Sequence, residues 1–267
     1  MITCSLQGGV GNQMFQIAAT IGAARTNDNE YCFSSVNHYL PLQGRHVQNY
    51  KDNIFSKLNI SDTDIQNIST FHNYRESSYS YNKITLNKHN NYILNGYFQS
   101  EKYFSHISDE IKDLFSVPEH YKKSLTEKYM LEENTNFVSL HVRRGDYLKF
   151  SDIHPACTEQ YYTKSILTIN ERDRIDKILI FSDDIDWCKK AMNFSKKIIF
   201  VEEKYDYLEL YLMFLCKHNI LANSSFSWWS AWINNNPNKI VIAPKVWFGP
   251  KGPQDTQDLI PDKWIVI

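Results

Sequence analysis

The sequence lacks the signatures of several simple classes of protein. Its five cysteines are odd in number, widely spaced and without a C-x-x-C pair, so neither a disulfide framework nor a zinc site is indicated. No run of about 18 apolar residues predicts a membrane span, and no basic segment precedes the first apolar stretch as it would in a signal peptide. These absences lead us to expect a protein of the cytoplasm.

An excess of charge of either sign is absent as well. The 29 basic and 30 acidic residues leave a net charge of −1, which offers no overall attraction to nucleic acid or to an anionic membrane. An anionic ligand would therefore need a local site. The 42% of hydrophobic and 14% of aromatic residues suffice for a sizeable core. A length of 267 residues favours two domains, which we place at 1–117 and 118–267, with a break at Pro118.

A glycine-rich turn follows the first predicted strand. The strand is the apolar run Ile2–Leu6, residues 7–13 read Gln-Gly-Gly-Val-Gly-Asn-Gln, and a helical pattern covers Met14–Ala24. The third glycine of a dinucleotide-binding fingerprint would fall on Met14, and no Gly-Lys-Ser/Thr follows for a phosphate loop. We expect instead a tight turn whose Asn12 and Gln13 side chains reach a ligand in a cleft between the domains, with Gly9 and Asn12 as donor-binding residues.

The rest of the N-terminal half carries weaker signals. Residues 36–92 are polar and rich in asparagine, with a helix predicted only around 62–68. Order returns with a strand predicted over 92–98. Helical segments are predicted near Lys102 and over 108–115.

Strands and helices alternate at short intervals in the C-terminal half. This alternation predicts a parallel sheet covered by helices, with strands at 137–143, 177–182, 197–201, 219–223 and 239–243. Ligands of such sheets bind beyond the carboxyl ends of the strands. The polar residues that follow the first four strands are therefore candidate site residues: Arg143, Arg144, Asp146, Ser182, Asp183, Asp184, Glu202, Glu203 and Asn223–Ser227.

Two arginines end the first of these strands, in the run His141-Val142-Arg143-Arg144-Gly145-Asp146. The guanidinium fork matches phosphate oxygens, whereas an ordinary surface pair balancing Asp146 is the plainer explanation. The position at a strand end favours phosphate binding. Because side chains alternate along a strand, Arg143 is expected to face the ligand on the same side as His141, with Arg144 in a structural role.

A serine-rich block precedes a predicted helix over 228–235. Asn223, Ser224 and Ser225 suit helix capping, and a helix start with several hydroxyls also suits a phosphate group. The tryptophans that follow are expected to pack in the core rather than to form a sugar platform. A rival site is Asp184-x-Asp186, because sugar-nucleotide enzymes can use this spacing to hold a divalent cation.

Taken together, these motifs resemble the α-1,2-fucosyltransferases of glycosyltransferase family 11. The resemblance rests on five segments that span nearly the whole chain: the glycine turn at 8–13, Gly96-Tyr97-Phe98-Gln99-Ser100 with Tyr103-Phe104, the His-x-Arg-Arg-Gly-Asp-Tyr run, Phe181–Asp184, and Asn223–Trp229. It implies an α/β, GT-B-like fold with two Rossmann-like domains. It further implies GDP-β-L-fucose as the donor, inversion to an α-linkage, and neither a metal nor another cofactor.

The resemblance also assigns roles to particular residues. Arg143 would bind the β-phosphate, His141 would support the nucleotide, and Ser224, Ser225 and the N–H group of Phe226 would hold the phosphates. Glu209 occupies the position of an acidic residue that receives the guanine N–H groups, although the family usually has Asp there. A carboxylate facing two donors is what selection of guanine over adenine requires.

The acceptor side is left more open. Attack by the acceptor hydroxyl needs a base, for which Asp146, Asp152 and His154 are candidates and Asp146 is preferred. The resemblance implies a glycan ending in galactose, with specificity set by loops within 36–92. We expect a bacterial enzyme of surface-polysaccharide assembly, peripheral at the cytoplasmic face of the membrane. The alternatives are a metal-dependent glycosyltransferase using another sugar nucleotide and a non-catalytic carbohydrate-binding protein.

Overall fold

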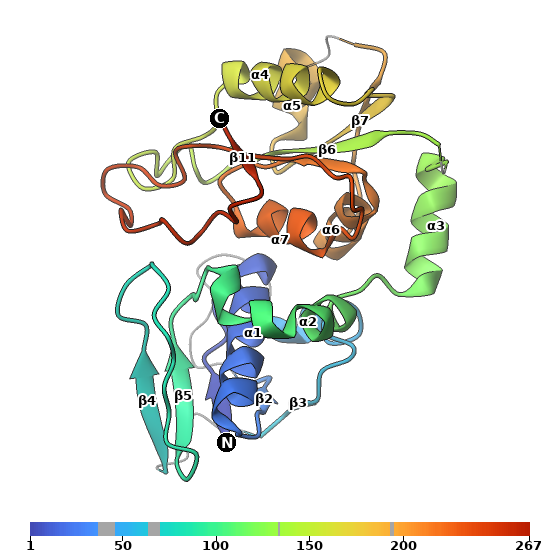
Figure 1. The fold of residues 1–267 in the computed structure, drawn as a ribbon. Coiled ribbons are helices and arrows are strands. Elements are labelled where there is room, and N and C mark those ends of the chain that lie inside the picture. Colours follow the sequence, from blue (N-terminus) through green and yellow to red (C-terminus); the bar gives the residue numbers. More distant parts are fainter. Residues whose placement is uncertain (37–45, 64–69, 133, 193–194) are drawn as a thin grey trace. The chain divides into compact units, whose positions relative to one another are not determined.

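The chain forms two compact units, each with its own parallel sheet (Figure 1). The computed structural model describes residues 1–36, 46–63, 70–132, 134–192 and 195–267. The first unit comprises Met1–Ser116 and Asp255–Pro261, and the second comprises Val117–Gln254 and Asp262–Ile267. Among the described residues, no helix combines the length and the apolar character needed to cross a bilayer.

The sheet of the first unit has three parallel strands in the order β1-β5-β4. Helix α1 contacts strand β1. In chain order, the elements of this unit are β1 (Ile2–Cys4), α1 (Val10–Asn27), β2 (Phe33–Ser34), η1 (Val47–Tyr50), β3 (Ile60–Ser61), β4 (Phe71–Arg75), β5 (Asn91–Asn95), η2 (Glu101–Tyr103), η3 (Ser105–Ile107) and α2 (Ser108–Leu114). Helix α1 is buried along most of its length, and the buried Thr20 hydroxyl donates to the carbonyl of Gln16 at 2.7 Å.

Most of the elements predicted for this unit are present with shifted ends. The helix expected over Met14–Ala24 begins four residues earlier, at Val10, and the strand expected over 92–98 ends at Asn95. Strand β4 was not predicted from the sequence. Residues 64–68 of the helix predicted over 62–68 lie outside the described residues.

The sheet of the second unit has six parallel strands in the order β11-β10-β9-β6-β7-β8. The strands are β6 (Phe137–Val142), β7 (Lys177–Ser182), β8 (Ile198–Phe200), β9 (His218–Ile220), β10 (Val241–Ala243) and β11 (Ile265–Val266). From the middle of the sheet, β6, β7 and β8 follow one another to one edge, and β9, β10 and β11 follow one another to the other edge. The order therefore reverses between β6 and β9, which is the position where open sheets of this kind bind their ligands.

Helices cover both faces of this sheet (Figure 1). Helices α4 (Glu159–Asn170) and α5 (Ile185–Ala191) lie on one face, and α6 (Asp206–Leu215) and α7 (Ser225–Ile233) lie on the other. Helix α3 (Glu119–Tyr129), which was not predicted, packs against α6. The expected α/β class with a parallel sheet is confirmed.

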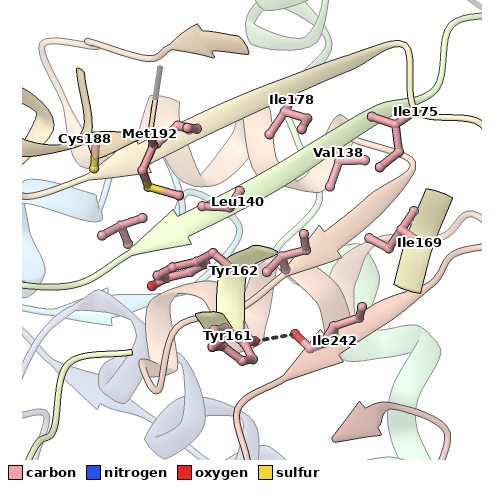
Figure 2. Close-up of a cluster of buried hydrophobic side chains, with 13 residues drawn as sticks. Val138, Leu140, Tyr161, Tyr162, Ile169, Ile175, Ile178, Cys188, Met192 and Ile242 are labelled. Carbon is pink, nitrogen blue, oxygen red and sulfur yellow. Dashed lines mark hydrogen bonds between the residues drawn. The ribbon is translucent and has the colours of Figure 1, made fainter. Parts of the chain in front are cut away.

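The core beneath α4 and α5 is an apolar cluster with one polar anchor (Figure 2). Val138, Leu140 and Ile178 of the sheet are at most 3% exposed and contact the aromatic rings of α4. The Tyr161 hydroxyl donates to the carbonyl oxygens of Leu221 at 2.7 Å and Ile242 at 3.2 Å. Burial of this hydroxyl is thus compensated by hydrogen bonds that tie α4 to the ends of β9 and β10.

The tryptophans of α7 form the core on the opposite face. Trp228 and Trp229 are fully buried, and the rings of Trp228 and Trp232 are stacked at 6.2 Å. Because these rings are buried, they are not available as a sugar-binding platform. The expectation that they pack in the core is confirmed.

Candidate active site

Two of the sequence motifs meet where the strand order reverses. Strands β6 and β9 are neighbours, with Leu140 paired to Ile220. The arginine run begins directly beyond β6, and the block Asn223–Ser227 begins three residues beyond β9. The carboxyl ends of two adjacent strands therefore present cationic groups and the start of helix α7 side by side, as an anion site at a switch point requires.

Arg143 is held between two carboxylates. Its Nη2 lies 2.7 Å from Oδ1 of Asp146, and its Nη1 lies 3.2 Å from Oδ2 of Asp183. Its guanidinium carbon lies 5.4 Å from the centre of the Tyr147 ring, a cation–π distance. The side chain is 32% exposed, so the guanidinium is oriented by its neighbours and still reachable by a ligand.

Asp183 connects this arginine to the next strand of the sheet. Its Oδ1 accepts a hydrogen bond of 2.9 Å from the backbone N–H of Arg144, while Oδ2 contacts Arg143. A Cβ atom on Gly145 would lie 2.5 Å from the same Oδ2, so glycine at this position leaves room for the carboxylate. The close approach explains the Arg-Gly-Asp spacing in local terms.

Arg144 contacts helix α5 instead. Its guanidinium carbon lies 3.8 Å from the centre of the Trp187 ring, and Nε lies 3.3 Å from Oδ2 of Asp184. Asp184 also caps α5 by accepting from Trp187 N, and Ser182 accepts from Asp184 N at 3.0 Å. Ser182 and Asp184, both predicted donor-binding residues, are thus engaged in the β7–α5 turn. Trp187 was missed because nothing in the sequence marks a tryptophan as a platform for an arginine.

His141 is a buried, neutral imidazole within the site. It is 5% exposed. Burial, as the larger cause, and the charge of Arg143 together lower the pKa of His141 to about 3. Its ring centre lies 5.6 Å from that of Phe226 on α7. Its Nδ1 atom is buried without a hydrogen-bond partner among the described residues. Such an orphaned polar atom in a native site calls for a functional explanation.

The serine block, Asn223–Ser227, caps helix α7 and adds residues beyond the end of β9 to the site. Ser224 is the N-cap and accepts from Phe226 N, and Ser225 begins the helix. Asn223 is 1% exposed, and its amide group donates to the carbonyls of Pro155 at 2.9 Å and Trp247 at 2.8 Å. Asn223 therefore positions the loops around the site.

Tyr147 joins the arginine run to the serine block. Its hydroxyl donates to the carbonyl of Asn223 at 2.9 Å, and its ring lies under Arg143. Burial is the main cause that raises the pKa of Tyr147, so the hydroxyl remains a donor. Sequence reasoning included this tyrosine in the motif but gave it no role; its place one turn after the arginines was the available signal.

Glu209 lies in the first turn of α6 and carries a strongly perturbed carboxyl group. Burial, the largest cause, raises the pKa of Glu209 to about 8, with contributions from the charges of Asp206, Glu203 and Asp183. The last of these connects Glu209 electrostatically to the residues around Arg143. A perturbed carboxyl near a phosphate-binding arrangement is typical of a functional site.

The glycine turn of the first unit is rigidly built. Gly8 has a φ of 76°, and a Cβ there would lie 2.5 Å from Nδ2 of Asn12. Gly9 is the N-cap of α1, and the Asn12 side chain accepts from Gln99 at 2.8 Å. The turn thereby meets the mid-chain motif within its own unit.

Glu76 supports that mid-chain motif and was missed in the sequence. Its two carboxylate oxygens accept from the backbone N–H groups of Tyr97 at 2.7 Å and Phe98 at 2.9 Å. Burial raises the pKa of Glu76, and the two hydrogen bonds oppose that rise. No local pattern marks a lone glutamate after an edge strand as the acceptor for a turn some 20 residues away.

Metal-ligating side chains are not clustered at Asp184-x-Asp186. Asp184 is committed to Arg144 and to the α5 cap, whereas Asp186 is exposed. Within the described ranges, no group of three or more His, Cys, Asp or Glu side chains is arranged to hold a metal ion.

The fold is of the α/β, GT-B-like class. The chain resembles the crystal structures of the fucosyltransferase NodZ from Bradyrhizobium (TM-score 0.53, 10% identity, 86% of this chain and 91% of that chain covered) and of POFUT1 in complex with GDP-fucose (TM-score 0.54, 10% identity, 91% and 97% covered). At these identities the likeness establishes the fold.

Comparison of the sequence with known proteins identifies the family of the chain. The model of glycosyl transferase family 11 matches residues 1–267, and the chain belongs to this family. It is 33% identical to an Escherichia coli α-1,2-colitosyltransferase (100% of this chain, 99% of that protein) and 30% identical to the E. coli O-antigen biosynthesis glycosyltransferase WbnK (99% of each). It is 23% identical to a Caenorhabditis elegans galactoside 2-α-L-fucosyltransferase (99% of this chain, 76% of that protein). The alternative of a non-catalytic carbohydrate-binding protein is thereby set aside.

Proposed function

We propose that this enzyme is a galactoside 2-α-L-fucosyltransferase, which moves L-fucose from GDP-β-L-fucose to the 2-hydroxyl of a terminal galactose with inversion at the anomeric carbon. The observation that carries the proposal is the position of Arg143, which lies beyond β6 at the switch point beside the start of α7. A guanidinium and a capped helix start at one edge suit a diphosphate.

Arg143 would act on the leaving group. As the bond between the anomeric carbon and the β-phosphate oxygen breaks, positive charge develops on the sugar and negative charge on the phosphate. The contacts of Arg143 with Asp146 and Asp183 already orient the guanidinium, so little reorganisation is needed when the phosphate arrives. Ser224, Ser225 and the N–H of Phe226 would bind the same phosphates from α7.

Glu209 would recognise the base of the nucleotide. Its carboxylate can accept the N1–H and N2–H groups of guanine, which adenine cannot offer in the same arrangement. The neutral imidazole of His141 would contribute its unpaired Nδ1 to the nucleotide side of the site. Gly9 and Asn12, at the tight turn of the first unit, would contribute a further contact to the donor.

The proposal needs no metal or cofactor, because Arg143 supplies the positive charge that a divalent cation would otherwise provide. A chelator test separates this from the rival reaction through Asp184-x-Asp186 and another sugar nucleotide. Transfer should continue in EDTA at the untreated rate. Loss of transfer in EDTA with recovery on adding manganese would support the rival.

A second donor is favoured by one comparison. The relative with 33% identity over the whole chain is an α-1,2-colitosyltransferase. Colitose is fucose without its 3-hydroxyl, so both donors suit the same phosphate and guanine contacts. A site that hydrogen-bonds the 3-hydroxyl discriminates strongly against the deoxy sugar, since its polar groups would be left unpaired. The sugar pocket therefore decides between these two donors.

The test is a paired donor assay. The purified enzyme is incubated with GDP-fucose or GDP-colitose and a panel of β-galactosides, with GDP release measured and the product linkage determined by NMR. We expect a higher kcat/KM for GDP-fucose and a new α-1,2 bond to galactose. The reverse donor order would assign the enzyme to colitose, and transfer with neither donor would refute both assignments.

The likeness to an O-antigen biosynthesis enzyme supports a role in surface-polysaccharide assembly. In that role the enzyme would act peripherally at the cytoplasmic membrane face on a galactose-terminated glycan. Assays with a lipid-linked and a free form of the same galactoside would show whether the acceptor must carry a lipid.

A further inference from the structure

The segment that follows the two arginines folds back on itself. Four backbone hydrogen bonds form successive turns: Leu148 N to Arg144 O at 2.9 Å, Lys149 N to Asp146 O at 3.0 Å, Phe150 N to Tyr147 O at 3.2 Å and His154 N to Phe150 O at 2.8 Å. These turns return the chain to the strand end where it began. The imidazole of His154 therefore lies next to the arginine site, although it is eleven residues beyond Arg143.

The imidazole of His154 contacts two aromatic rings. It stacks on Tyr147 with ring centres 4.9 Å apart and planes inclined by 17°, and its centre lies 5.5 Å from that of Phe248. The loop carrying Phe248 is joined to the segment by the hydrogen bond from Gly249 N to Ile153 O at 2.9 Å. The stacked contact with Tyr147 and the tilted contact with Phe248 restrict the orientation of the imidazole.

Those two nitrogens differ in their surroundings. Nδ1 of His154 is buried and has no hydrogen-bond partner among the residues that the structure describes. The side chain as a whole is only partly buried, which leaves Nε2 as the ring nitrogen open to a substrate. One nitrogen thus faces the protein and the other faces outward, the arrangement seen when a histidine is oriented from behind.

Asp146 provides the complementary group. Both of its carboxylate oxygens are buried, and its contact of 2.7 Å with Arg143 is an ion pair without hydrogen-bond alignment. Its charge acts on His154, where it raises the imidazole pKa, whereas burial, the largest cause, and Arg143 lower it. Asp146 and His154 are thus coupled through charge, and each has a buried polar atom without a hydrogen-bond partner among the described residues.

Resting on the proposed transfer reaction, we propose that His154 is the catalytic base and that the charge of the Asp146 carboxylate orients it by attracting Nδ1–H. The acceptor hydroxyl would give its proton to Nε2 while its oxygen bonds to the anomeric carbon. The bond from that carbon to the β-phosphate breaks, and its electron pair leaves with GDP. The imidazolium then releases the proton to water.

In this proposal His154 takes the proton from the acceptor, and Asp146 positions His154. With both oxygens buried and one of them ion-paired to Arg143, Asp146 is a positioning residue rather than a group that reaches the acceptor. The net lowering of the His154 pKa keeps the imidazole neutral at pH 7, as a base must be. The other charges on the packed segments are Lys149, Asp152 and Lys251, and the last two pair with each other at 2.7 Å.

The experiment compares His154→Ala, His154→Gln and the control His89→Ala, which replaces an exposed histidine of the first unit. Transfer with a saturating donor and GDP binding by calorimetry are measured for each. We expect both His154 variants to lose about 100-fold or more in kcat, the scale of general-base catalysis. GDP affinity should change less than about threefold, since the base does not hold the nucleotide. Added imidazole should restore part of the rate to His154→Ala only.

The pH profile provides a readout that a merely structural role would not move. The wild-type kcat, measured with saturating donor, should fall at acid pH as His154 becomes protonated, and this acid limb of kcat should be absent from His154→Gln. Asp146→Asn removes the charge that favours the imidazolium, so its acid limb should shift to lower pH while its plateau falls.

Near-wild-type transfer by the His154 variants, or an acid limb that His154→Gln retains, would overturn this proposal while leaving the proposed function intact. Absence of transfer by the wild-type enzyme with both nucleotide sugars would instead overturn the proposed function, and the assignment of His154 with it. Weakened GDP binding in both His154 variants would assign the residue to the donor site and also refute its role as the base.

Discussion

Nη1 of Arg143 lies 3.2 Å from Oδ2 of Asp183, and this contact joins the ends of strands β6 and β7. Nη2 of the same guanidinium lies 2.7 Å from Oδ1 of Asp146, so a second carboxylate stands beside it. In the proposed reaction these carboxylates orient the guanidinium in advance, while the 32% exposure of its side chain leaves it reachable by the diphosphate.

Arg143→Ala should lower kcat by about 100-fold or more, the scale for loss of one preorganised donor. Arg143→Lys should recover only part of this loss, because an ammonium group keeps the charge but not the fork. Steady-state transfer kinetics measure both effects. Arg172→Ala, which removes an exposed arginine after α4, is the matched control and should behave as wild type. Unchanged kcat in Arg143→Ala would contradict the leaving-group role.

GDP binding should release a proton below about pH 8. The pKa of Glu209 is raised to about 8, so its carboxyl group is protonated in the free enzyme at neutral pH. Guanine recognition requires the carboxylate, so affinity should weaken by up to about tenfold for each unit that pH falls below 8. Calorimetry in buffers of different ionisation enthalpy measures the released proton. Glu209→Gln should bind GDP more weakly and without this pH dependence; an equally pH-independent wild type would exclude the assignment.

The same carboxyl group should affect stability in the opposite direction. Because the folded pKa of Glu209 is raised above its unfolded value, the protein is most stable below about pH 4.5 with respect to this group and loses stability as pH rises to about 8. Glu209→Gln does not ionise. Its Tm relative to wild type should therefore increase across that interval and level off above it, as thermal unfolding at a series of pH values would show. A constant difference in Tm would indicate that the buried carboxyl carries no such cost.

Arg144→Ala should reduce stability more than activity. The substitution removes the contact with Trp187 at 3.8 Å and the ion pair with Asp184. A partly buried cation–π contact contributes about 1–2 kcal/mol to the free energy of unfolding. Chemical denaturation should show a loss of that size, with kcat within a few fold of wild type. A loss in kcat as large as that of Arg143→Ala would assign Arg144 to the site.

Glu76→Ala should destabilise the mid-chain motif. The change leaves the N–H groups of Tyr97 and Phe98 without their acceptor, and each unsatisfied group costs about 1–3 kcal/mol when buried. We expect a lower free energy of unfolding and faster amide exchange at these two positions. Exchange rates equal to those of wild type would show that water replaces the carboxylate at little cost.

The strands of the second unit could be predicted from the sequence because parallel strands covered on both faces are continuous apolar runs. The strand predicted over 137–143 is β6 at Phe137–Val142, and the one over 177–182 is β7 with the same bounds. Because ligands of such sheets bind at the carboxyl ends of the strands, the predicted strand ends also pointed to the arginines and the serine block.

Strand β4 could not be predicted because its residues bear no apolar pattern. None of its five residues is buried, and it pairs with β5 alone at the edge of the sheet. Helix α3 escaped for a similar reason, since only Leu125 and Tyr129 of its residues are buried. Elements that bury few side chains are specified by tertiary contacts that a local pattern does not contain.

The sequence also could not predict which site residues from separate strands contact one another. The motif contains Arg143 and Asp146, whereas Asp183 follows a different strand and reaches Arg143 only through the sheet. The raised pKa of Glu209 depends on burial and on Asp183, neither of which can be inferred from its neighbours in the chain. The sequence thus indicated the chemical groups of the site but not the contacts that set their charge.

The short segment Asp255–Pro261 belongs to the first unit although it follows nearly the whole of the second. Within the first unit, Asp255 accepts from Tyr79 N at 2.8 Å, and Asp258 accepts from Tyr81 N and pairs with Lys102. A single cut after residue 117 would separate these carboxylates from their donors. The N-terminal piece would keep the donors, and the C-terminal piece would keep Asp255 and Asp258. Neither unit is one continuous segment of the chain, so a single crossover between relatives cannot exchange a whole unit.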